Sequence, residues 1–73
     1  MKTNVISLYS DMRVVVRQRK LDGHWEVWPQ KFIDGKWLDH AGDVVAVRQK
    51  RTDALMIALQ FSTKLLKSLE GIA

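Results

Sequence analysis

Cysteine is absent from this chain of 73 residues. Neither a disulfide framework nor a thiolate zinc site can therefore stabilise it, and its length allows one domain near the lower limit for an unassisted apolar core. No stretch approaches the roughly 20 apolar residues that cross a bilayer, and the N-terminal residues do not form a signal peptide. The sequence predicts one small cytoplasmic domain that depends on the packing of large side chains, including its three tryptophans.

Motifs for catalysis and for metal or cofactor binding are also missing. His24 and His40 are the only histidines, and the chain has neither a Gly-rich phosphate loop nor a metal-binding spacing such as His-x-x-x-His. Asp39 and Asp43 put carboxylates near His40, but a polar loop is the better interpretation in a fold with no obvious pocket there. We predict no enzymatic activity, no metal, no cofactor and no small-molecule substrate.

Segments rich in β-branched and aromatic residues predict a three-stranded antiparallel meander, at residues 13–20, at residues 24–28 followed beyond Pro29 by 31–33, and at residues 36–38, with a fourth short strand at residues 44–49. Two Asp-Gly pairs, at residues 22–23 and 34–35, each predict a tight hairpin, because Asp and Gly tolerate the positive φ that a type I′ turn needs at both central positions. Pro29 lacks an N–H and predicts an edge, a strand end or a bulge after the second segment.

The hydrophobic period changes after residue 51 and indicates a helix. Thr52 is the predicted N-cap, Asp53 lies in the first turn, and Gly71 marks the C-terminal end. The apolar residues fall on one arc of roughly 200°, and they are Ala54, Leu55, Ile57, Ala58, Leu59, Phe61, Leu65, Leu66 and Leu69. The predicted fold class is therefore α+β, with an antiparallel sheet of three or four strands packed on one C-terminal helix.

This apolar arc is wider than the roughly 100° stripe that covers one sheet face, so a further element must cover it. The candidates are a second copy of the chain, a partner protein, or the N-terminal segment with Val5, Ile6, Leu8 and Tyr9. We assign residues 1–12 to an N-terminal segment that is flexible or partner-binding, and residues 13–73 to one compact domain. The oligomeric state stays open.

Strand alternation separates two of the tryptophans. Trp25 and Val27 share one face and predict core positions, whereas Glu26 and Trp28 lie on the other face. Trp28 is either core or cover for an edge, or else part of a contact surface, since large aromatic residues are favoured interface anchors.

The first strand gathers basic side chains on one face, namely Arg13, Arg17 and Arg19, with Lys20 following. This basic stripe suits phosphates or an acidic protein surface, or else it is a solvated face paired with Glu26 or Asp34. The net charge of +4 is unevenly spread, because residues 1–20 carry five basic and one acidic side chain, and residues 21–43 carry two basic and five acidic ones. The acidic middle would repel a nucleic-acid duplex and favours a protein partner.

The layout of the whole chain is the segment MKTNVISLYS ahead of a compact domain, the strand RVVVRQRK, the Asp-Gly hairpins and the helix TDALMIALQFSTKLLKSLEG. In this layout and in overall size the chain resembles a small phage-encoded regulator that binds host RNA polymerase. The resemblance implies a non-enzymatic inhibitor in the cytoplasm of a host bacterium. Such a regulator binds near the amino terminus of the polymerase's largest subunit, interferes with the sigma factor and can also suppress termination.

The binding residues that we predict come from the patterns above, namely Val5, Ile6, Leu8, Tyr9, Arg13, Arg17, Arg19, Lys20 and Trp28. The alternative function is a small nucleic-acid-binding module that contacts phosphates through the basic stripe, with Trp28 stacking on bases. Salt separates the two hypotheses, because phosphate binding weakens steeply with salt and a protein interface with an apolar centre weakens less.

Overall fold

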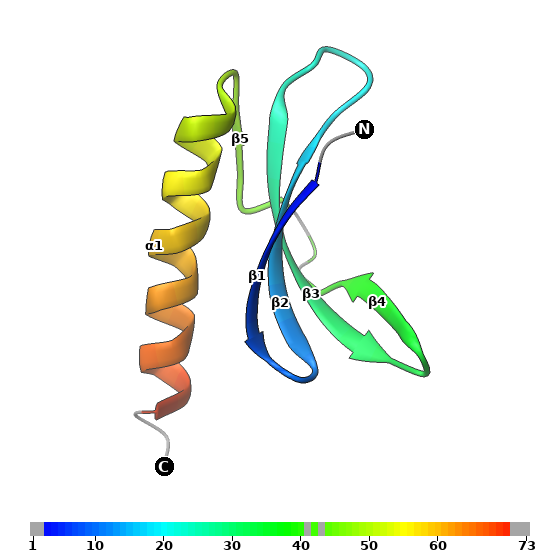
Figure 1. Ribbon diagram of the computed structural model, residues 1–73, viewed down its shortest axis with the longest axis vertical. Coiled ribbons are helices and arrows are strands. Elements are labelled where there is room, and N and C mark those ends of the chain that lie inside the picture. The colour runs from blue at the N-terminus through cyan, green and yellow to red at the C-terminus, as the bar shows by residue number, and fades with distance from the viewer. Residues whose placement is uncertain (1–2, 41, 43, 71–73) are drawn as a thin grey trace.

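Five strands and one helix form two layers in the computed structural model, which describes residues 3–40, 42 and 44–70 (Figure 1). The elements are β1 (Thr3–Tyr9), β2 (Met12–Gln18), β3 (Trp25–Ile33), β4 (Lys36–Asp39), β5 (Ala46–Arg48) and α1 (Arg51–Glu70). The sheet is antiparallel in the order β1-β2-β3-β4, and β5 also pairs with β3. The predicted α+β class, a sheet packed on one C-terminal helix, is confirmed. No helix in the described part of the chain is long and apolar enough to cross a membrane.

The central strand β3 runs straight through Pro29, where the sequence suggested two shorter segments. On one side β3 pairs with β2 along its length, and on the other it pairs first with β5 and then with β4. The carbonyl of Pro29 accepts a hydrogen bond from the His40 N–H at 2.9 Å, so its missing N–H also faces this second side, between the stretches paired with β5 and β4. The proline therefore removes no bond to β2.

The two Asp-Gly turns differ from each other. Asp34 and Gly35 both have positive φ, 51° and 77°, which matches the predicted type I′ turn. At the other turn only Gly23 has positive φ, and the prediction of a type I′ turn is wrong. The carboxylate of Asp22 instead accepts bonds from the His24 N–H and from the Arg19 guanidinium, and this holds a wider loop.

The main core lies between the sheet and α1. It contains Val14, Val16, Trp25, Val27, Ala54 and Ala58. The two alanines are fully buried, and such small side chains allow the helix backbone to approach the sheet closely. Trp25 is only 8% exposed, which confirms its predicted core position.

The helix departs from the prediction in two places. It begins at Arg51, and the Lys50 carbonyl accepts the Ala54 N–H, so Thr52 lies inside the first turn rather than at the N-cap. Leu59, which we placed on the buried arc, is 57% exposed, whereas Ser62 is buried and donates its hydroxyl to the Ala58 carbonyl. The side of the helix that packs on the core is thus narrower than the arc of apolar residues. The predicted stop at Gly71 and the side chain of Leu69 lie outside the described residues.

The N-terminal residues belong to the sheet. We separated residues 1–12 from the domain, but residues 3–9 form β1, which pairs antiparallel with β2 from Thr3 to Tyr9, and Met12 already begins β2. Ile6 and Leu8 pack against the core on the helix side. The N-terminal segment therefore supplies part of the cover that the wide apolar arc requires.

Candidate functional site

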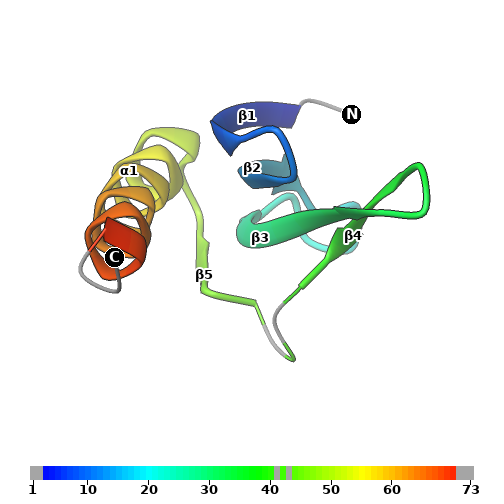
Figure 2. The same ribbon diagram turned by 90° about the horizontal axis from the view of Figure 1, so that it is seen from below.

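The sheet face opposite α1, which we call the open face, carries the largest group of predicted binding residues. Figure 2 shows α1 on one side of the stacked strands β1, β2 and β3, with the β3–β4 hairpin extending away from it. Directly paired residues of antiparallel strands share a face. The register therefore places together Val5, Ser7, Arg13, Val15, Arg17, Glu26, Trp28, Gln30, Phe32, Trp37 and Asp39.

Trp28 and Val15 form the apolar centre of the open face. They pair directly, and Val15 is only 2% exposed although no helix covers it. The guanidinium carbon of Arg17 lies 5.3 Å from the centre of the Trp28 ring, within the range of a cation–π contact. Trp28 is half-buried, so it both covers its neighbour and presents part of its ring to solvent.

Arg17 is held by two carboxylates on this face. Its Nη2 lies 2.8 Å from Oδ2 of Asp39, and its Nε lies 3.6 Å from Oε1 of Glu26. The hydrogen bond to Asp39 raises the pKa of Arg17, against the effect of burial. Burial alone would raise the pKa of Asp39, but hydrogen bonds from Arg17 and Gln30 outweigh it and hold that pKa below its usual value. The positive charge of Arg17 is therefore largely balanced within the protein.

Arg13 is bound differently. Its Nε donates to Oε1 of Gln30 at 2.8 Å, and its guanidinium carbon lies 4.2 Å from the centre of the Trp37 ring. Trp37 in turn meets Phe32 edge to face, with ring centres 5.2 Å apart. Among the described residues Arg13 has no acidic partner within ion-pair distance. Arg13 thus carries an unbalanced cation, a positive charge without an acidic partner among these residues, beside the paired rings of Trp37 and Phe32.

Arg19 and Lys20 lie in the loop after β2 rather than on the strand. Arg19 pairs with Asp22 at 2.6 Å and with Glu26 at 3.6 Å, so the predicted pairing of the stripe with Glu26 is confirmed. The hydrogen bond from Arg19, followed by that from the His24 N–H, holds the pKa of Asp22 well below its usual range. Asp34, the other predicted partner, makes no ion pair in the part of the chain that the structure describes.

The structure brings only some of the predicted binding residues together. Val5, Arg13, Arg17 and Trp28 share the open face, and Tyr9 is exposed at the end of β1 beyond a register shift. Ile6 and Leu8 face the core instead. Strand alternation already separates these two groups, because neighbouring residues of β1 point to opposite faces.

Sequence reasoning missed the members of the open face that lie in the β3–β4 hairpin, namely Gln30, Phe32, Trp37 and Asp39. Their signal was the two-residue turn at Asp34-Gly35. That turn sets the pairing of Gln30 with Asp39 once β3 is allowed to continue through Pro29.

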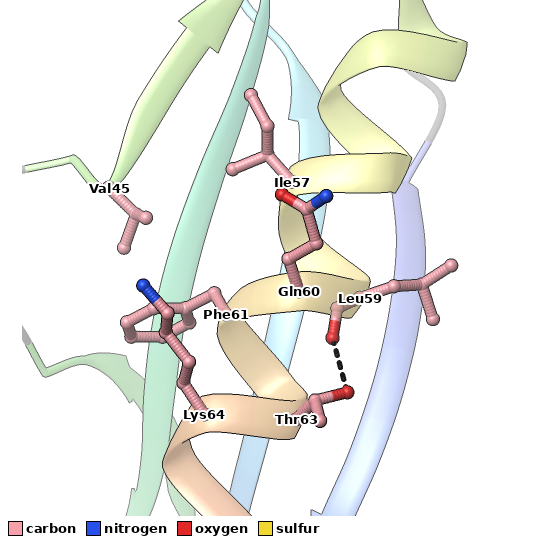
Figure 3. Close-up of a pocket in the computed structure, with 7 residues that line it drawn as sticks. All are labelled: Val45, Ile57, Leu59, Gln60, Phe61, Thr63 and Lys64. Carbon is pink, nitrogen blue, oxygen red and sulfur yellow. Dashed lines mark hydrogen bonds between the residues drawn. The ribbon is translucent and has the colours of Figure 1, made fainter.

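A second exposed region lies along α1. It is an open hollow of about 560 Å³, lined by Val45, Ile57, Leu59, Gln60, Phe61, Thr63 and Lys64. Figure 3 shows Val45 and Phe61 to one side of the helix and Leu59 and Thr63 to the other; the Thr63 hydroxyl donates to the Leu59 carbonyl at 2.9 Å. The lining is mainly apolar and contains no acid or imidazole. It therefore offers contact area rather than acid-base chemistry.

The open face is suited to binding. Its charged and polar side chains bond to one another, and its rings lie beside arginines. No group of histidine and acidic side chains among the described residues could hold a metal ion. Comparison with protein-family models, curated proteins and solved structures found no match for the chain.

Proposed function

We propose that the protein is a non-enzymatic transcription regulator of the phage type that binds bacterial RNA polymerase through its open face. In this proposal it acts in the cytoplasm of the host bacterium, inhibits initiation by interfering with the sigma factor, and suppresses termination. The observation that carries the choice of a protein partner is the pairing of Arg17 with Asp39 and Glu26. A basic stripe with its own carboxylates is poorly suited to phosphates.

The cost of phosphate binding supports this choice. A phosphate at Arg17 would have to displace a carboxylate at 2.8 Å and would face the negative charges of Asp39 and Glu26. A protein surface can instead bury the exposed parts of Trp28, Phe32 and Val5 without breaking these pairs. Tryptophan and arginine are the residues most enriched at the energetic centres of protein interfaces.

The proposed identity of the partner comes from the resemblance in size and layout. It indicates a regulator that binds near the amino terminus of the largest polymerase subunit. The net charge of +4 and the unbalanced cation of Arg13 favour an acidic region of that subunit.

An NMR titration tests the proposal. The isotopically labelled protein is titrated at one moderate salt concentration with an amino-terminal fragment of the polymerase's largest subunit and, separately, with random duplex DNA. We expect the fragment to shift the indole N–H signals of Trp28 and Trp37 and the amides of β2, while DNA leaves them unchanged. Shifts with DNA alone, together with a steep loss of binding with salt, would establish the nucleic-acid-binding module in its place.

A variant pair strengthens this test. Arg13→Lys keeps the charge but loses the planar contact with Trp37, whereas Lys50→Gln removes a charge from the exposed segment before α1, outside the open face. We expect Arg13→Lys to weaken binding of the fragment about tenfold, which corresponds to roughly 1.4 kcal/mol, and Lys50→Gln to leave it nearly unchanged. The same order should appear in sigma-dependent transcription with purified polymerase. Weaker binding with Lys50→Gln but not with Arg13→Lys would indicate binding by net charge alone, because only Lys50→Gln changes the charge.

A further inference from the structure

The outer edge of β1 exposes a regular set of unpaired backbone groups. In β3 the Phe32 N–H donates to the Asp11 carbonyl on the β2 side, while the Pro29 carbonyl accepts from His40 on the β4 side. The residues of β3 that directly pair with Val14 and Val16 therefore direct their backbone N–H and C=O groups away from β2. By the antiparallel alternation, the backbone groups of Val14 and Val16 point toward β1 and bond to those of Ile6 and Asn4.

The alternate residues of β1 must then direct their backbone N–H and C=O groups outward, away from β2. Thr3, Val5 and Ser7 pair with Arg17, Val15 and Arg13 in the positions whose N–H and C=O groups face away from β2. No described strand lies on that side of β1. The spacing of these donors and acceptors is the one that an additional antiparallel or parallel strand requires.

This edge also lacks the features that usually prevent strand addition. The segment Thr3–Tyr9 contains no charged residue and no proline, and it pairs in register with β2 from Thr3 to Ser7. Natural proteins protect exposed edges with lysine, proline, bulges or covering elements. The only irregularity is the register shift after Ser7, so the first part of the edge is regular and open.

An apolar flank of α1 lies beside the same edge. Leu55, Leu59 and Leu66 share one side of the helix by their spacing, and Figure 3 shows Leu59 pointing to the side on which β1 lies. Leu59 is 57% exposed, and the other two are half-buried. Ile6 and Leu8 point to the helix side of β1 and extend the core up to this edge. A strand added at β1 would place every second side chain against this flank.

We propose that β1 receives an extended segment of the protein partner as an additional strand. The segment is apolar at alternate positions, which face Leu59, and neutral or acidic at the positions between them. This inference rests on the proposed function and names how the partner is held. A second copy of the chain is the less suitable occupant, because each copy carries the same net charge of +4.

Amide hydrogen exchange tests strand addition residue by residue. In the free protein the amides of Val5 and Ser7 should exchange quickly and that of Ile6 slowly, because only the Ile6 amide is bonded within the sheet. Saturation with the amino-terminal polymerase fragment should slow exchange at Val5 and Ser7 at least tenfold and change Ile6 little. Slow exchange at Val5 and Ser7 in the free protein, increasing with its own concentration, would show β1 pairing between copies and overturn the choice of occupant.

Two substitutions at one position separate the backbone from the side chain. Val5→Pro removes an outward N–H without removing a bond to β2, whereas Val5→Ala keeps the N–H and shortens the side chain. We expect Val5→Pro to weaken binding of the fragment more than tenfold and Val5→Ala less than threefold. The exchange protection of the β2 and β3 amides shows whether each variant is folded. If Val5→Pro does not fold, the exchange rates of Val5 and Ser7 in the unaltered protein still decide whether a strand is added at β1.

The outcomes distinguish this inference from the function itself. Binding of the fragment with Trp28 and Trp37 shifts, but without new protection at Val5 and Ser7, would overturn strand addition and leave the proposed function standing. Absence of binding to the fragment would overturn both.

Discussion

Arg17 on β2 reaches across β3 to Asp39 on β4, with its Nη2 2.8 Å from Oδ2 and its Nη1 3.3 Å from Oδ1. The same carboxylate accepts the side-chain amide of Gln30 at 3.0 Å. Asp39 therefore joins three strands on the open face. This link orders the β3–β4 hairpin relative to β2, and it also holds Arg17 beside Trp28.

A double-mutant cycle at Arg17 and Asp39 measures this link. Arg17→Gln and Asp39→Asn should each reduce the free energy of unfolding, and the double variant should lose less than the sum of the two. We expect a coupling of about 1 kcal/mol, because both side chains are about one-third exposed and exposed ion pairs are worth roughly that much or less. Urea unfolding followed by tryptophan fluorescence gives the four values, and a coupling of zero would mean that solvent screens the pair completely.

The same pair predicts how stability depends on acid. The pKa of Asp39 lies below its usual value of 3.8 in the folded protein, so the unfolded chain binds the proton more readily. Its contribution is therefore fully present above about pH 4–5 and is lost as the pH falls through the lowered pKa. We expect the difference in stability between the unaltered protein and Asp39→Asn to shrink between pH 5 and pH 2. A difference that stays constant over this range would show that the pKa of Asp39 is not lowered by folding.

Much of this fold follows from local sequence patterns. The alternation of Trp25 and Trp28, the Asp34-Gly35 turn and the C-terminal helix are each determined within a few residues, and the structure agrees with all three. Asp22-Gly23 has the same local signal as Asp34-Gly35. Its turn differs because Asp22 bonds to Arg19 and His24, and such competing contacts are not contained in the dipeptide.

The open face was only half predictable, for a similar reason. Arg13, Arg17 and Trp28 follow from strand alternation alone. Trp37 and Asp39 require knowledge that β3 continues through Pro29, because only then do they share a face with Trp28 and the arginines of β2. A proline in a central strand argues against continuity unless its missing N–H falls where the ladder of backbone bonds is interrupted. Here the interruption lies between the stretches of β3 that pair with β5 and with β4, and the local sequence does not reveal where β5 pairs.

Neighbouring positions of β1 give a direct test of which face is buried. Ile6 packs against the core on the helix side, whereas Val5 is 47% exposed on the open face. We expect Ile6→Ala to reduce the free energy of unfolding by about 2 kcal/mol, and Val5→Ala by less than about 1 kcal/mol. Thermal unfolding followed by circular dichroism measures both. A larger loss at Val5 would reverse the assignment of the two faces and with it the outward direction of the Val5 side chain.

Asn4 offers a site where a substitution should stabilise the protein. Its Oδ1 is a buried side-chain acceptor without a hydrogen-bond partner, and the residue lies on the helix side of β1 opposite Val16. Leaving a buried polar atom unpaired costs about 1–3 kcal/mol. Valine removes that atom, suits a strand and resembles its neighbour across the pair.

We therefore expect Asn4→Val to raise the free energy of unfolding by about 1 kcal/mol in urea unfolding. Thr3→Val, at an exposed position on the same strand, is the matched control for strand propensity and should gain only a few tenths of a kcal/mol. Equal gains at both positions would attribute the effect to propensity alone. A loss at Asn4 would show that its amide makes a stabilising bond in solution. The gain should leave binding by the outer edge of β1 intact, because Asn4 directs its backbone groups toward β2 and not outward.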